Sequence, residues 1–80
     1  MKVTIVGIEE VEYVSKRTNK EVTGRKIYYT YPFDPKKDAV GLIAESTFCS
    51  YDISEDLNVG DNIEILYNRY GSVADIRLIE

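Results

Sequence analysis

Residues 2–15 read KVTIVGIEEVEYVS, and this stretch decides the expected fold. The side chains of a strand alternate between its two faces. Val3 and Ile5 share one parity, but the apolar positions change phase around Gly7 and return to the first parity farther along. A strand that changes its buried face at a glycine is expected to be bulged or sharply bent there. Such a strand can serve two sheets at the corner of a small barrel.

In the rest of the chain, apolar and polar residues also alternate as they do in β-strands, and residues typical of turns separate these segments. The further expected strands cover residues 22–33, 42–51, 62–67 and 73–79. Residues 16–20 are expected to form the polar tip of the first hairpin, and Gly71 is expected at positive φ in the last one. Residues 34–41 read as a charged loop, and Ser54 is expected to cap one helical turn over 54–58.

Five strands in 80 residues predict an all-β protein with one domain that covers residues 1–80. A small five-stranded barrel of the OB-fold type accounts for the long bent first strand, and an SH3-like barrel is the alternative. Closing a sheet into a barrel removes the edges that would otherwise pair with other chains. A homodimer is a reasonable expectation, because so short a chain buries a small core.

Strand parity also predicts which side chains form that core. The expected core residues are Ile5, Ile27, Phe48, Ile63, Ile65 and Ile76. Tyr13 and Tyr67 follow the apolar parity of their strands and are expected to face inward. Cys49 lies in an apolar run, so it is expected to be a buried and unreactive thiol.

The residue inventory argues against catalysis and metal binding. The chain has no histidine and a single cysteine, so it offers neither a base that titrates near neutral pH nor four zinc ligands. Neighbouring carboxylates such as Glu9 and Glu10 point to opposite faces of a strand and cannot share a proton. We therefore expect no enzyme, no catalytic residue, no metal site and no cofactor.

No apolar run is long enough to span a membrane, and the first strand begins at once, without a cleavable signal. A soluble, cytoplasmic protein without a membrane partner is the expectation.

Charge is distributed very unevenly along the sequence. Residues 16–37 carry seven basic residues and two acids, whereas the remainder carries three basic residues and twelve acids. Four of the nine aromatic residues lie in the basic segment. Cations next to aromatic rings are typical of proteins that bind single-stranded nucleic acid, because phosphates need counter-charges and unpaired bases need stacking partners. A pI of about 4.8 means that such binding must be local.

Parity assigns the residues that would contact a strand of nucleic acid. If Ile27 faces the core, Tyr28 and Lys26 point outward with Arg25 nearby, and Tyr28 becomes a stacking platform. In an OB barrel the loop after the first strand and the loop after the fourth strand flank one binding face. The candidate nucleic-acid-binding residues are Lys16, Arg17, Lys20, Arg25, Lys26, Tyr28, Arg69 and Tyr70.

The end of the chain carries a resemblance to a known family. Residues 57–65 read LNVGDNIEI and residues 70–79 read YGSVADIRLI, in which a Gly-Asp turn starts one strand and a glycine hairpin returns the next. With the basic, tyrosine-bearing first hairpin, this order resembles the small OB-fold helix-destabilising proteins of filamentous phages, and related small proteins of phages and plasmids. The resemblance implies binding of single-stranded DNA. The chain departs from the pattern in its acidity.

A different class of function is also open. Residues 38–64 contain seven acids and no lysine or arginine, so an acidic face could dock onto a basic protein partner. The simplest alternative is that these acids only keep the surface soluble.

Overall fold

The computed structural model describes residues 1–79, which form five antiparallel strands and one helical turn. The elements are β1 (Lys2–Val14), β2 (Glu21–Pro32), β3 (Leu42–Ser50), α1 (Tyr51–Ser54), β4 (Asn62–Tyr67) and β5 (Val73–Ile79). The prediction of an all-β protein with five strands is confirmed. None of the helices in this described part is long and apolar enough to cross a membrane.

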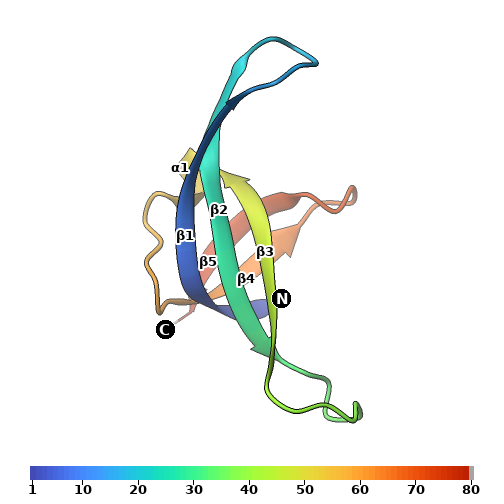
Figure 1. The fold of residues 1–80 in the computed structure, drawn as a ribbon. Helices are drawn as coiled ribbons and strands as arrows, with labels where there is room; N and C mark the ends of the chain where they lie inside the picture. Colours follow the sequence, from blue (N-terminus) through green and yellow to red (C-terminus); the bar gives the residue numbers. More distant parts are fainter. Residues whose placement is uncertain (80) are drawn as a thin grey trace.

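The five strands form one strongly curved sheet with the order β3-β2-β1-β4-β5 (Figure 1). The two edge strands, β3 and β5, curl toward one another until some of their Cα atoms lie within 8 Å. Within residues 1–79 they are not hydrogen-bonded as neighbours, so the sheet is barrel-like but not closed. This arrangement is compatible with a small OB or SH3 barrel, and the helical turn between β3 and β4 suits the partly open OB type.

A β-bulge lets β1 take part in both halves of the sheet. Ile5 pairs with Tyr29, and the next pair is Gly7 with Tyr28, so Val6 is the extra residue. The first residues of β1 also pair with β4. The predicted irregularity at Gly7 is confirmed, and it turns the side chains beyond it to the opposite faces. Gly71 has a φ of 82°, which confirms the predicted positive-φ turn.

The β1–β2 hairpin extends beyond the body of the sheet as an arm (Figure 1). Its pairing continues as far as Val14 with Glu21, and the molecule measures 45 × 25 × 22 Å. At the tip, the Ser15 amide donates to the Lys20 carbonyl oxygen at 2.9 Å, and Asn19 adopts a φ of 56°. Asparagine tolerates this left-handed conformation better than most residues, so the tip is a well-formed turn.

The core lies between the two halves of the curled sheet. The buried apolar residues are Val3, Ile5, Ile27, Tyr29, Cys49, Leu57, Ile63 and Ile65. Four of the six predicted core residues are among them, and Ile76 packs against them while partly exposed. The prediction for Phe48 is wrong, because this side chain is 40% exposed. Cys49 takes the inward position of β3, so its neighbour Phe48 must point outward.

The inward prediction for Tyr13 is also wrong, whereas that for Tyr67 is not. Tyr13 is 50% exposed because the bulge at Val6 reverses the alternation of β1 and puts Tyr13 on the outward side, opposite Val22. Tyr67 is 42% exposed at the end of β4, but it keeps the inward side of the strand, where it hydrogen-bonds with the buried Tyr29. The register shift between Leu66 and Tyr67 leaves Ala74 of β5 as the extra residue, so the alternation of β4 continues as the parity argument assumed.

The helical turn begins earlier than predicted. α1 ends at Ser54 instead of starting there, and Ser54 is fully buried. Its hydroxyl donates to the Ser50 carbonyl oxygen at 3.0 Å, so it satisfies the preceding turn and does not cap a following one. The charged loop after β2 forms turns without a helix.

Candidate nucleic-acid interface

The side chains of β2 and β3 that point away from the core form one surface, which we call the outer β2–β3 face. Its members are Val22, Gly24, Lys26, Tyr28, Thr30 and Pro32 of β2 and Leu42, Ala44, Ser46, Phe48 and Ser50 of β3. None of these residues is acidic, although the chain contains 14 acids. The outer β2–β3 face is therefore a neutral to basic surface on an acidic protein.

Tyr28 lies near the centre of this face and is held on three sides. Its ring lies against Gly7, where an added Cβ atom would be 3.5 Å from the Tyr28 side chain. The Lys26 Nζ atom lies 5.5 Å from the ring centroid, and the Tyr28 hydroxyl donates to Glu9 at 3.0 Å. The outward direction of Tyr28 and Lys26 agrees with the sequence prediction. Because the ring is anchored, it would lose little side-chain entropy on contact with a base.

Phe48 and Tyr13 add an aromatic pair that sequence reasoning placed in the core. The Phe48 ring lies across Gly24, where an added Cβ atom would be only 2.5 Å from the ring. Tyr13 meets Phe48 edge to face, with 6.4 Å between the ring centroids. Both rings are substantially exposed. The one sequence signal for this pair is Gly24, which shares the parity of Lys26 and Tyr28 and leaves room for a ring above the strand.

Arg25 faces the other side of β2 and is engaged by the protein itself. Its Nε atom donates to Glu10 at 2.8 Å, and Nη1 donates to the Ser54 carbonyl oxygen at 2.8 Å. The guanidinium also lies 4.8 Å from the centroid of the Tyr51 ring. Its side chain is only 15% exposed. Arg25 therefore fixes α1 against β1 and β2, and we leave it out of the candidate interface.

The other predicted cations lie on two hairpin tips. Lys16, Arg17 and Lys20 are exposed at the end of the arm. Arg69 lies 5.1 Å from the centroid of the Tyr70 ring, and Tyr70 is 77% exposed at the β4–β5 tip. Figure 1 shows the two tips at separate corners of the molecule, so they do not form one compact patch. The ion pair recorded within residues 1–79 is that between Arg25 and Glu10.

Inward-facing tyrosines meet a carboxylate at the rim of the core. The rings of Tyr29 and Tyr31 stack with 6.2 Å between centroids, and the Tyr29 hydroxyl donates to Glu45 at 3.4 Å. Burial and a hydrogen bond with Tyr67 raise the pKa of Tyr29 well above its usual value. Burial, and after it the hydrogen bond with Glu45, raises the pKa of Tyr31. These phenols therefore stay protonated near neutral pH and serve as packing groups.

The arrangement offers little for metal or thiol chemistry. Residues 1–79 contain no group of three or more acidic or cysteine side chains that could hold a metal ion. Cys49 is a buried free thiol, and burial raises its pKa, which reduces the fraction of reactive thiolate.

Comparison with known proteins does not extend this picture, because no family model, curated protein or solved structure matches the chain.

Proposed function

We propose that the protein binds single-stranded nucleic acid, DNA being the first choice, on the outer β2–β3 face. The observation that carries the proposal is the composition of this face. Phe48 and Tyr28 expose aromatic rings beside Lys26, and Tyr13 adjoins Phe48. No residue of the face itself is acidic in a chain of net charge −4, and the carboxylate that borders it is Glu9 of β1, on the Tyr28 hydroxyl. Exposed rings beside a cation are what unpaired bases and phosphates require.

Stacking supplies the main attraction in this proposal. Each base stacked on an aromatic side chain contributes about 1–3 kcal/mol, independently of its identity. A duplex keeps its base faces covered, so the same rings would favour single strands. Lys26 and the arm cations Lys16, Arg17 and Lys20 would neutralise phosphates along the strand.

The acidic remainder of the surface limits where a strand can lie. Asp52, Glu55 and Asp56 are exposed around α1, on a segment without basic residues. These carboxylates repel phosphates, so a bound nucleic acid would be confined to the outer β2–β3 face and the arm. The resemblance to the phage single-strand-binding proteins supports DNA as the first ligand to test.

Titration of labelled oligo-dT and oligo-U into the protein tests the proposal, with a duplex of equal length as the control. Three to five phosphate contacts predict a slope of about −2 to −4 for log affinity against log salt concentration. A dissociation constant weaker than about 100 μM for both single strands at low salt would overturn the proposal.

A protein-interaction module is the second candidate, favoured by the exposed acidic segment around α1. In that case a basic protein partner would bind the Asp52–Glu55–Asp56 surface, and Glu55→Gln/Asp56→Asn would weaken the complex. The same double substitution should leave or slightly raise oligonucleotide affinity if the outer β2–β3 face binds the strand.

A further inference from the structure

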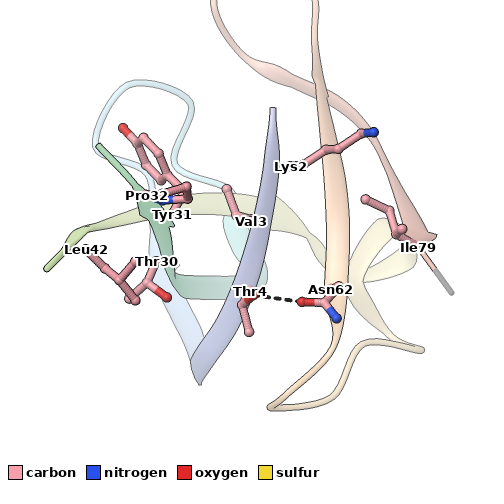
Figure 2. A pocket seen from close by; sticks show the side chains of 9 residues that line it. All are labelled: Lys2, Val3, Thr4, Thr30, Tyr31, Pro32, Leu42, Asn62 and Ile79. Atoms are coloured by element: carbon pink, nitrogen blue, oxygen red, sulfur yellow. Dashed lines mark hydrogen bonds between the residues drawn. The ribbon is translucent and has the colours of Figure 1, made fainter. Parts of the chain in front are cut away.

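A pocket of about 330 Å³ lies where the beginnings of β1, β3 and β4 meet the ends of β2 and β5. Figure 2 shows apolar side chains, Pro32, Leu42 and Ile79, together with the polar groups of Thr4, Thr30 and Asn62. Its volume is at the lower end of the range for small-molecule sites. The pocket combines apolar walls with a few hydrogen-bonding groups, as small-molecule sites in general do.

The pocket continues the outer β2–β3 face. Thr30 follows Tyr28 by two residues on the same side of β2, a displacement of about 6.6 Å along the strand. On β3, Leu42 stands in the same outward row as Phe48. A single-stranded oligonucleotide that passes from Phe48 over Tyr28 would therefore reach the pocket. The small residues Ala44 and Ser46 form the surface between Phe48 and the pocket.

The polar groups of the pocket are oriented before any ligand arrives. The Thr4 hydroxyl donates to Asn62 Oδ1 at 2.7 Å, as the dashed line in Figure 2 marks. This bond fixes the Asn62 amide, so that its Nδ2 group remains a donor and the Thr4 oxygen remains an acceptor. Every nucleobase carries a donor next to an acceptor on its pairing edge, and proteins that recognise unpaired bases of RNA use that edge. Lys2 also lines the pocket and supplies a cation for the adjoining phosphate.

We propose that this pocket holds one unpaired nucleobase of the bound strand, with Asn62 and Thr4 hydrogen-bonded to its edge and the apolar side chains of the pocket wall in contact with its ring. The inference rests on the proposed function and adds to it a second mode of base recognition, insertion into a pocket in addition to stacking on exposed rings. Because all four bases satisfy the pattern, the pocket tolerates different sequences.

Side-chain amide signals in NMR spectra test the proposal on the unaltered protein. The chain has four asparagines and no glutamine, so the spectrum contains four side-chain amide pairs. Loss of one pair in Asn62→Ala assigns the Asn62 signal. Oligo-dT should shift the Asn62 pair and leave the Asn58 pair, which lies in the turn before β4, unchanged.

Abasic oligonucleotides give the second measurement. In an oligonucleotide only just long enough to fill the face, so that it cannot shift its register, a single abasic site placed at successive positions should lower the affinity of the wild-type protein about five- to tenfold at one position. The same abasic site should cost Asn62→Ala much less, because the contact is already lost.

Two results would overturn the inference in distinguishable ways. If oligo-dT binds and shifts the Phe48 and Tyr28 signals but not the Asn62 amide, the pocket is not a base site and the proposed function stands. If no oligonucleotide binds at all, the proposed function fails and the pocket inference fails with it.

Discussion

At the scale of single residues, neighbours in the sequence have opposite roles on β2. Arg25 is turned toward α1 and Glu10, whereas Lys26 lies over the exposed Tyr28 ring. The two cations are adjacent and carry the same charge, yet only Lys26 lies on the outer β2–β3 face. The same separation occurs on β3, where Cys49 is buried and Phe48 is exposed.

Phe48→Leu should weaken oligonucleotide binding without changing its dependence on salt. Leucine keeps an apolar cover over Gly24, so the fold is retained, but it cannot stack on a base. We expect a loss of about 1–3 kcal/mol in binding free energy at every salt concentration. Lys26→Met is the contrast, because removing one phosphate contact should make the salt slope shallower by about 0.7. A shallower slope for Phe48→Leu would contradict the stacking role.

Glu9→Gln should strengthen binding. Glu9 lies opposite Lys26 and accepts a hydrogen bond from the Tyr28 hydroxyl. Glutamine at this position keeps an acceptor for that hydrogen bond. Removing one charge about 6 Å from a phosphate in water is worth about 0.7 kcal/mol, or roughly threefold in affinity. The gain should fade at high salt because of screening. Glu12→Gln, on the opposite face of the arm, is the control and should change affinity less.

At the scale of elements, one extra residue in β1 shapes the outer β2–β3 face. The bulge at Val6 places Gly7 opposite Tyr28, and the absent side chain of glycine leaves the space against which the Tyr28 ring packs. A second glycine, Gly24, leaves the corresponding space for Phe48. Both aromatic platforms are therefore seated on strand positions that lack a side chain.

The helical turn α1 depends on a single side chain of β2. Arg25→Met keeps most of the apolar stem but leaves the Ser54 carbonyl oxygen without its charged donor. We expect the free energy of unfolding to fall by about 1–3 kcal/mol, measured by urea denaturation. Lys26→Met should change it by less than about 0.5 kcal/mol. Oligonucleotide affinity should fall in Lys26→Met and change little in Arg25→Met. A strong loss of affinity in Arg25→Met with unchanged stability would show that Arg25 belongs to the interface.

At the scale of the whole molecule, the fold keeps the cations of the hairpin tip apart from the acids around α1, although along β1 and β2 it pairs acids with cations, Glu9 with Lys26 and Glu10 with Arg25. The arm carries Lys16, Arg17 and Lys20 away from the body, whose α1 region carries exposed acids (Figure 1). A chain of net charge −4 can therefore present a local basic surface.

Neutralising the arm tip should reduce the salt dependence of binding more than any other charge change. Lys16→Gln/Arg17→Gln/Lys20→Gln removes three cations and should make the slope of log affinity against log salt shallower by up to about 2. Arg69→Gln/Tyr70→Ala should have a smaller effect, because that tip lies at a different corner. Arg77→Gln on β5 is the single-charge control. An unchanged slope in the triple variant would show that the arm does not contact phosphates.

Short stretches of the sequence were sufficient to predict several features of the structure. Alternation located the strands, and the predicted ranges of the last two agree with β4 and β5. The irregularity at Gly7 and the turn at Gly71 could also be predicted from the sequence, because each depends on a few adjacent residues. The outward direction of Tyr28 followed from a single buried neighbour, Ile27.

Only the tertiary structure decided which surfaces the core covers. Phe48 and Tyr13 form an exposed pair because Cys49 takes the inward position on β3 and because the bulge at Val6 turns Tyr13 to the outward side of β1. Arg25 is engaged because α1, almost thirty residues later, returns to it. Neither fact follows from parity, since parity gives two faces of a strand but does not say which partner lies opposite each face or where the partner ends.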